Sequence, residues 1–233
     1  LNTRLGNLGN VLEQDASQTK LLQLRSPVLS NAAFEAMRDY MGDTAVEVDC
    51  TFEADGGDNA LRDAMDRIRR DAENAVRGGA VQVGPDRAPI PMILATGGVH
   101  SHLIRESLRT FTSLNVRSGE CLDTHYFAVL IGVGATTVNA YLAQEAIADR
   151  FDRGLFGDRS LDDCVERYVE AVNQGLLKIM SKMGISVISP YRGACKFEAI
   201  GLSRTLVSEY FPGMSSRISG IGLTGIQRNA VRL

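Results

Sequence analysis

The histidines and cysteines of this chain are the residues best suited to metal binding or covalent chemistry. His100 and His102 stand two positions apart, and His125 lies downstream. Residues at i and i+2 do not share a helix face, although they converge at a strand end or in a loop. The four cysteines are widely spaced, with no C-x-x-C pair: Cys50, Cys121, Cys164 and Cys195. We expect packing or capping histidines and free thiols, not a zinc or iron–sulfur site made within this chain.

The segment Gly132-Val133-Gly134-Ala135 is a candidate phosphate-binding loop. It follows an apolar run and precedes a predicted helix, and the N–H groups at the start of a helix point toward an anion. However, Thr137 stands where the third glycine of G-x-G-x-x-G belongs, and no P-loop lysine follows. The alternative is a tight strand–helix turn that requires small residues.

Ser181-Lys182 and Arg192-Gly193 are two further candidates for binding an anion or a flavin phosphate. The alternative for them is an ordinary helix C-terminus and a polar turn. No G-x-S-x-G motif occurs, and no Cys–His pair can be argued from the order of the residues. The residues alone therefore predict no catalytic site.

The composition indicates a soluble globular protein of 233 residues, with 44% apolar and 23% charged residues. The net charge is -3 with both signs interspersed and tryptophan is absent, which argues against nucleic-acid binding. No apolar run approaches the ~20 residues of a membrane span, and no signal peptide opens the chain. We expect a cytoplasmic protein. The chain begins with Leu1 instead of Met, from which we expect a piece of a longer protein.

The candidate residues must be held by elements that the hydrophobic pattern predicts. The clearest is a helix over 59–77, in which Leu61, Met65 and Ile68 begin one apolar face. Helices are also predicted over 32–40, 99–110, 136–151, from Ser160 onward and 195–200, and strands over 45–52, 80–83, 90–96, 112–116 and 185–188. Ser30 or Asn31 is the expected cap of the first helix. Residues 123–133 fit either helix or strand, and the tail after Gly213 is predicted to be irregular.

Strands that alternate with helices indicate βαβ units and parallel strands. We therefore predict an α/β fold that forms either a partial (β/α) barrel or an open wound sheet. The chain divides into an irregular N-terminal segment, residues 1–25, and one domain over 26–233.

One stretch resembles a known family. KIMSKMGIS, followed by SPYRGACKFEAIGL, is similar to a signature of the large chain of glutamate synthase. Other segments resemble that family in the same order, from about residue 21 onward: SPVLSN, DCTF, DRAPIPMILATGGVHSHLIRESLR, DTHYFAVLIGVGATTVNAYLAQEAI and FPGMSSRISGIGL. The chain is identified as similar to the central domain of that family.

The resemblance implies a role for the chain within a larger oxidoreductase. In that family an α/β central domain, similar to an incomplete TIM-type or FMN barrel, joins a glutamine amidotransferase domain to an FMN domain that carries a 3Fe-4S cluster. It helps to wall an ammonia tunnel between them. The complete enzyme forms two glutamates from glutamine and 2-oxoglutarate, with electrons from NADPH, NADH or ferredoxin. A small (beta) subunit or ferredoxin is then a partner, and this piece alone has no cofactor and no catalytic residue.

The resemblance also gives the candidate site residues. Asn31, in PVLSN, and Thr51, in DCTF, fall in segments that resemble tunnel-facing segments of the family. Small polar side chains supply the hydrogen-bond partners that ammonia needs along such a path. The four cysteines match neither the family's catalytic cysteine nor its cluster ligands. Departures from the family pattern include Ser101, Val133, Ala140 and Cys195.

Two hypotheses of different classes follow. The first is a connecting and channelling domain of glutamate synthase with no chemistry of its own. The second is a stand-alone flavin- or phosphate-binding barrel, which would use the glycine-rich and arginine-containing turns. A truncated barrel exposes apolar edges, so self-association of the chain is also expected.

Overall fold

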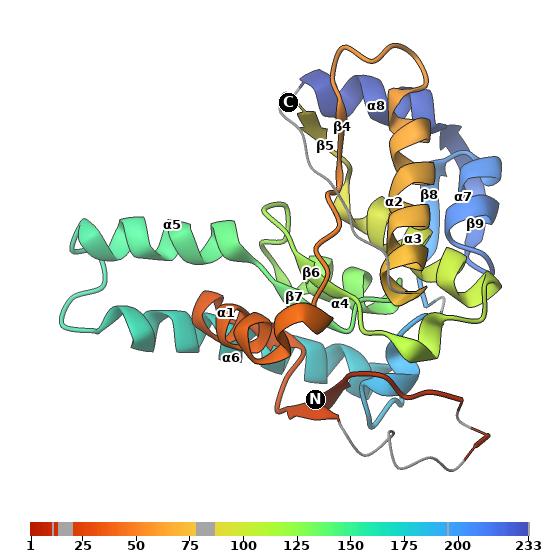
Figure 1. The fold of residues 1–233 in the computed structure, drawn as a ribbon. Helices are drawn as coiled ribbons and strands as arrows, with labels where there is room; N and C mark the ends of the chain where they lie inside the picture. Colours follow the sequence, from red (N-terminus) through yellow and green to blue (C-terminus); the bar gives the residue numbers. More distant parts are fainter. Residues whose placement is uncertain (11, 14–20, 78–86, 195, 233) are drawn as a thin grey trace. The chain divides into compact units, whose positions relative to one another are not determined.

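A computed structural model describes residues 1–10, 12–13, 21–77, 87–194 and 196–232 of the chain (Figure 1). These residues form two compact units. Unit 1 is drawn from residues 1–5, 21–45 and 114–193, and unit 2 from 6–20, 46–113 and 194–233. The fold is mixed α/β, as predicted, and the described residues contain no closed barrel.

Unit 1 contains a three-stranded parallel sheet in the order β3-β7-β6. The strands of unit 1 are β1 (Thr3–Leu5), β2 (Leu22–Leu24), β3 (Val28–Leu29), β6 (Asn115–Arg117) and β7 (Thr137–Asn139). Its helices are α1 (Asn31–Met41), α4 (Thr124–Gly132), α5 (Tyr141–Asp152) and α6 (Leu161–Lys182), with 3₁₀ turns at Gly42–Thr44 and Ser189–Tyr191. The strands β1 and β2 form a separate antiparallel pair, although residues 1–25 were predicted to be irregular.

Helices α1 and α6 of unit 1 begin at polar caps that the sequence identifies. The side chain of Ser30, and not that of Asn31, accepts from the N–H of Ala33 at the start of α1. Ser160 caps α6 in the same way. The helix α6 packs closely on α4, because a Cβ on Gly175 would lie 2.4 Å from a carbon of Thr124.

Unit 2 is built mainly from helices. Its helices are α2 (Ala60–Arg77), α3 (Met92–Arg105), α7 (Arg204–Tyr210) and α8 (Leu223–Arg232), with a 3₁₀ turn at Arg109–Phe111. Its strands are β4 (Thr51–Glu53), β5 (Arg87–Pro89), β8 (Glu198–Leu202) and β9 (Ser215–Ile221). The strands pair as antiparallel β4–β5 and parallel β8–β9. The helix α2 confirms the prediction over 59–77, with Leu61, Met65 and Ile68 fully buried.

The strand predicted over 90–96 is wrong, because this segment opens the helix α3. A short continuous apolar run fits a buried helix as well as a buried strand. Gly97 and Gly98 do not break the element but lie inside it. A Cβ on Gly97 would lie 2.2 Å from Phe211, and one on Gly98 would lie 2.5 Å from Met65, so these glycines allow neighbouring side chains to approach α3 closely.

The single helix predicted over 136–151 is also wrong at its start. Thr137–Asn139 form the central strand β7, and helix α5 begins only at Tyr141. All three strand residues are buried, so no alternation of polar and apolar side chains marks the strand. The segment predicted as strand over 112–116 is confirmed in part by β6.

The C-terminal predictions require two corrections. Residues 185–188 form no strand and lead into the 3₁₀ turn that contains Pro190, and residues 198–202 are strand β8 where a helix was predicted. The tail after Gly213 is not irregular, because it forms β9 and α8. Gly220 permits the close pairing of β9 with β8, because a Cβ on it would lie 2.1 Å from the carbonyl oxygen of Gly201. The predicted strand over 80–83 lies outside the described residues.

Candidate functional site

The carboxyl edge of the parallel sheet in unit 1 gathers three amide side chains. Strand β3 leads into Asn31, strand β7 ends at Asn139, and helix α5 carries Gln144 one turn after that strand. Parallel strands place their carboxyl ends at one edge, which is where ligands bind in open α/β sheets. This edge of the sheet is therefore a candidate functional site.

The three amides form one hydrogen-bonded cluster. Asn139 donates through Nδ2 to Oδ1 of Asn31 at 2.9 Å and to the carbonyl of Leu29 at 3.1 Å. Gln144 accepts from the backbone N–H of Asn31 at 2.7 Å. It also donates through Nε2 to the carbonyls of Leu29, at 3.3 Å, and Ala140, at 3.2 Å. Gln144 thus ties the start of α1 to the end of β3.

The cluster combines buried and accessible groups. Asn139 is 1% exposed and Gln144 is 4% exposed, whereas Asn31 is half-buried and lines a groove with Gln144. The Oδ1 of Asn139 is buried and has no hydrogen-bond partner among the described residues. An unpaired buried acceptor is uncommon, and a small donor would satisfy it. Neutral amides bind and orient a small polar molecule, but they do not act as nucleophiles or general bases.

Thr51 lies in unit 2, so the two predicted tunnel residues belong to different units. Its hydroxyl donates to Oδ1 of Asp49 at 2.8 Å, and its carbonyl accepts from Arg67 at 2.7 Å. Arg67 also donates to the carbonyl of Asp49 at 3.0 Å. The segment that precedes β4 is therefore held against α2 by one guanidinium group.

The glycine-rich segment 132–135 does not precede a helix, so its prediction as a strand–helix phosphate loop is wrong. It follows the C-terminus of α4 and leads into strand β7. A helix C-terminus presents carbonyl groups and repels an anion. Two carbonyl groups of this segment already accept hydrogen bonds. That of Gly132 accepts from the N–H of Gly193 at 2.8 Å, and that of Ala135 accepts from Nε of Arg192 at 3.0 Å.

The structure thus brings together two of the phosphate candidates, but as partners of each other. Burial lowers the pKa of Arg192, and its Nη2 has no hydrogen-bond partner among the described residues. The third candidate, Ser181-Lys182, lies at the C-terminal end of α6, where Lys182 complements the helix dipole. Two of these three segments lie at helix C-termini, which do not favour a phosphate.

Two of the three histidines, His100 and His102, make separate contacts in unit 2. His102 shares a hydrogen bond of 2.9 Å with Glu73, and this bond is the main cause that lowers the pKa of that carboxyl. His100 accepts at Nδ1 from Nε of Arg109 at 2.9 Å. Within the described ranges, no group of three or more His, Cys, Asp or Glu side chains is arranged to hold a metal ion.

Three cysteines fall in the described part of the chain and are free thiols. Cys121 and Cys164 are buried in unit 1, and Cys50 is half-buried in unit 2. Burial raises the pKa of the Cys50 thiol to about 11, with Asp49 adding to the effect, and burial also raises that of Cys121. Thiols with raised pKa values are poor nucleophiles at neutral pH. Cys195 lies outside the described residues.

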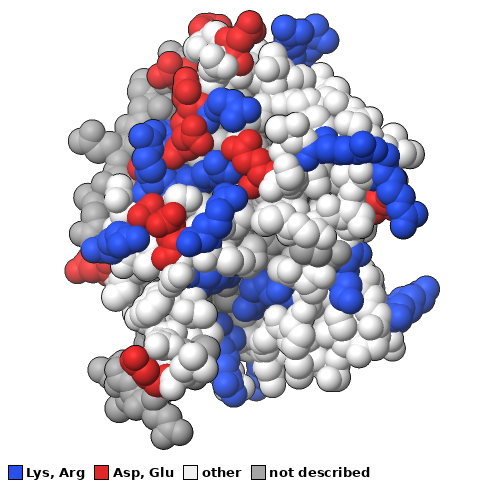
Figure 2. Space-filling model, turned by 90° about the vertical axis from the view of Figure 1, so that its right-hand side faces the viewer, with Lys and Arg blue, Asp and Glu red and all other residues white. Residues whose placement is uncertain are grey.

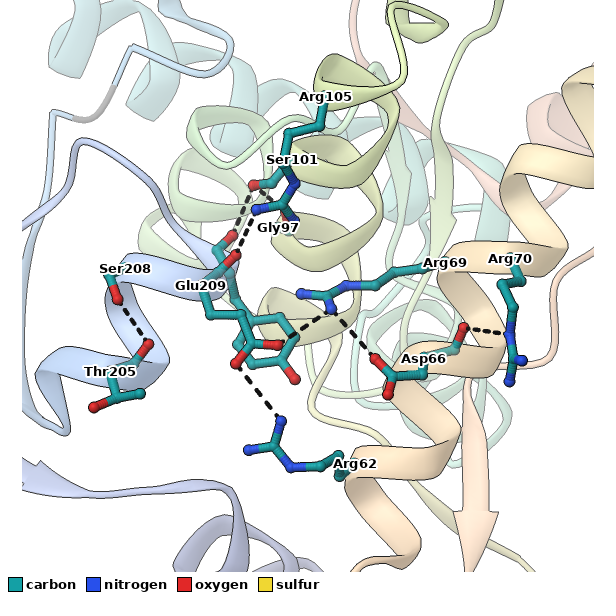
Figure 3. A network of polar contacts seen from close by, with 11 residues as sticks. Arg62, Asp66, Arg69, Arg70, Gly97, Ser101, Arg105, Thr205, Ser208 and Glu209 are labelled. Carbon is teal, nitrogen blue, oxygen red and sulfur yellow. Dashed lines mark hydrogen bonds and ion pairs between the residues drawn. The ribbon is translucent and has the colours of Figure 1, made fainter.

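A charged network connects three helices of unit 2 (Figure 3). Arg69 of α2 reaches Asp66 and Glu209, each at 3.3 Å, and its guanidinium lies 4.3 Å from the ring centre of Tyr210. Ser101 of α3 donates to the carbonyl of Tyr210 at 2.8 Å. Figure 2 shows basic and acidic side chains interleaved over one part of the surface, as the sequence predicts. The network links α2, α3 and α7.

Asn139 and Gln144 are the members of the amide cluster that the sequence prediction missed. Both lie in a segment predicted as continuous helix, where a polar residue would face solvent. The signal that identifies Asn139 is its position directly after two β-branched residues, Thr137 and Val138, which favour a strand. A polar residue directly after a buried strand is a candidate for a sheet-edge site.

The described residues form a mixed α/β fold with an amide cluster at one sheet edge. A model of the family "Glutamate synthase central domain" matches residues 1–203. The chain belongs to the glutamate synthase central domain family.

Individual relatives cover nearly all of this chain. It is 68% identical over 238 residues to the glutamate synthase [NADPH] large chain of Azospirillum brasilense, which covers 99% of this chain and 16% of the relative. It is 37% identical to the corresponding Bacillus subtilis large chain (99% and 15%) and 36% identical to ferredoxin-dependent glutamate synthase 2 of Synechocystis (95% and 15%). The chain thus spans about one sixth of these relatives.

Helix length and polarity bear on membrane association. In the part of the chain that the structure describes, every helix is too short or too polar to cross a membrane.

Proposed function

We propose that this chain is the connecting domain of a glutamate synthase and that it helps to wall the path by which ammonia passes from an amidotransferase domain to an FMN domain. Family membership supports the first part, because the relatives are named as glutamate synthases. The catalytic residues, the FMN and the 3Fe-4S cluster belong, in this proposal, to other domains of the polypeptide. In this proposal the complete enzyme receives electrons either from a pyridine nucleotide through a small subunit or from ferredoxin.

The amide cluster is the observation that carries the second part. Ammonia is a neutral hydrogen-bonding molecule, so amide oxygens and N–H groups guide it without trapping it. A carboxylate beside it would favour ammonium, because an opposite charge stabilises the charged form. Asn31 is accessible, and the unpaired Oδ1 of Asn139 lies within the same cluster. Thr51 remains part of the proposal as a second polar group on the path.

The alternative of a stand-alone flavin-binding barrel has no observation in its favour. Its glycine-rich candidate follows a helix C-terminus, and Arg192 is held by the carbonyl of Ala135.

Isotope dilution tests the ammonia path directly. A glutamate synthase large chain that carries these residues is supplied with glutamine labelled with ¹⁵N in the amide, 2-oxoglutarate, reductant and excess unlabelled ammonium. The ¹⁵N content of the newly formed glutamate is then measured by mass spectrometry. We expect Asn31→Leu and Thr51→Val to lower this content, because ammonia escapes and exchanges with the bulk pool.

Asn74→Leu is the matched control, since Asn74 is an exposed residue of α2. It should leave the ¹⁵N content at the wild-type value. Unchanged labelling in both Asn31→Leu and Thr51→Val would overturn the proposed path.

A further inference from the structure

A groove of about 880 Å³ lies in unit 1 between the start of α1 and the helices α5 and α6. Figure 1 shows α5 and α6 as two long helices joined by a short loop, and the two helices are in contact. The groove is open in this structure, and no residue of unit 2 lines it.

Two parallel ridges of α6 form one wall of the groove. The apolar ridge consists of Leu161, Val165 and Val169, and the acidic ridge of Asp162, Glu166 and Glu170. Each ridge follows the i, i+4 spacing along which another helix packs. The wall thus offers an apolar row beside a charged row, which is the complement of one amphipathic helix.

The charge of the groove is one-sided. Glu145 of α5 adds a fourth carboxylate, and no Lys or Arg lines the groove. None of the four carboxylates makes an ion pair within the described residues; Glu170 accepts only from Gln174, at 2.5 Å. By contrast Asp163, which lies outside the groove, pairs with Arg167 at 3.0 Å. Like charges at i and i+4 repel each other, so the acidic ridge weakens α6 unless a partner opposes it.

The opposite wall permits close approach. Ala32 and Ala33 at the start of α1 and Ala148 of α5 line it with small side chains. Small residues let a backbone come near, so a helix can enter the groove without displacing α1 or α5.

We propose that this groove binds a basic amphipathic helix that lies outside these 233 residues, with apolar residues against Leu161, Val165 and Val169 and Lys or Arg side chains against the acidic ridge. A second copy of the chain is a poorer occupant. Its own basic helix, α8, already buries Leu223 within unit 2. The inference does not depend on the ammonia path, although an occupant would also shield Asn31 from bulk water.

The test uses two synthetic helical peptides of equal length and the 233-residue chain. One peptide carries leucine along one face and lysine on both flanks, and the other replaces each lysine by glutamate. Binding is followed by fluorescence anisotropy, and amide chemical shifts in α5 and α6 map the site. We expect saturable binding of the leucine–lysine peptide that weakens with salt, and at least tenfold weaker binding of the leucine–glutamate peptide.

The variant Glu166→Lys/Glu170→Lys reverses the acidic ridge, and Asp39→Lys/Asp149→Lys is its control. The control residues are exposed acids of unit 1 outside the groove, so both variants change the net charge equally. We expect the ridge variant to lose at least tenfold in affinity and the control to lose less than threefold. Circular dichroism verifies that both variants are folded.

Four results would overturn the proposal. Equal losses in both variants would show diffuse attraction to an acidic protein. Equal binding of both peptides would show non-specific apolar contact. Absence of saturable binding, or concentration-dependent dimers that the ridge variant abolishes, would show that the groove takes another occupant.

Discussion

In unit 1 the central polar groups are neutral amides, whereas in unit 2 they are guanidinium and carboxylate groups. Asn139 and Gln144 are nearly inaccessible, and each makes two or more hydrogen bonds. Arg69 is similarly buried, at 8% exposed, but two of its nitrogens have no hydrogen-bond partner among the described residues. The amides hold a polar edge together without net charge, whereas Arg69 contacts carboxylates and an aromatic ring. Under the proposed function, this difference fits passage of a neutral molecule along the amide cluster of unit 1.

The largest expected effect comes from Gly97→Val in unit 2. The new side chain would begin 2.2 Å from the ring of Phe211, and such overpacking costs about 3 kcal/mol. Native-state hydrogen exchange of the α3 amides should report this loss. Gly222→Ala is the control, because its Cβ would meet only Ser203 Oγ, at 3.6 Å. Unchanged α3 protection would contradict the close packing of α3.

Gln144→Leu should have the next largest effect, and in unit 1. It leaves the N–H of Asn31 without its acceptor and removes two donated hydrogen bonds, so we expect a loss of about 2 kcal/mol. The loss should be the same in low and high salt, because no charge is involved. Urea unfolding measures this loss in the free energy of unfolding, and hydrogen exchange of the α4 amides gives a local readout. A strongly salt-dependent loss would break the contrast between the units.

Arg69→Met should change the stability of unit 2 by less than about 1 kcal/mol. The acidic partners of Arg69 are partly exposed, so they regain water when the guanidinium is removed. Methionine keeps the packing against Tyr210, whose pKa burial raises to about 12, so the phenol stays neutral. Urea unfolding at low and high salt tests this. A loss of several kcal/mol would mean that unit 2 depends on this charge.

The smallest effect concerns Glu73 and pH. The hydrogen bond from His102 lowers the pKa of Glu73 below its ordinary value. A lowered folded-state pKa adds stability above the unfolded pKa, and this stability is lost as the pH falls through the folded pKa. Glu73→Gln should therefore flatten the stability curve of unit 2 on the acid side of pH 5. Superimposable curves for wild type and variant would refute the link.

The sequence predicted correctly those elements that have one solvent-exposed face and one buried face. Helices α1, α2 and α6 show the helical period because one face of each is exposed and the other is buried. Ser30 caps α1 and Ser160 caps α6. The start of helix α3 and strand β7 were not predicted correctly, because residues 94–99 and 137–139 are continuously buried and carry no such period. Strand β8 was missed because its partner, β9, follows in a glycine-rich tail.

The candidate site was predictable only in part. Asn31 came from a family resemblance, and no local pattern connects it with Asn139, which lies more than a hundred positions away. Their meeting depends on parallel pairing of β3 with β7, and β3 contains two residues. Long-range pairing of such short strands produces almost no recognisable sequence pattern. The place of Asn139 and Gln144 in the cluster is therefore visible only in the structure.

The central claim is that this chain connects and channels but has no cofactor chemistry of its own. The most direct test titrates the 233-residue chain with FMN and follows flavin fluorescence, with the cooperative melt of the protein as evidence of folding. The account predicts a cooperative melt and no saturable quenching of the flavin. Stoichiometric quenching that Arg192→Gln abolishes would contradict it and restore the flavin-binding hypothesis.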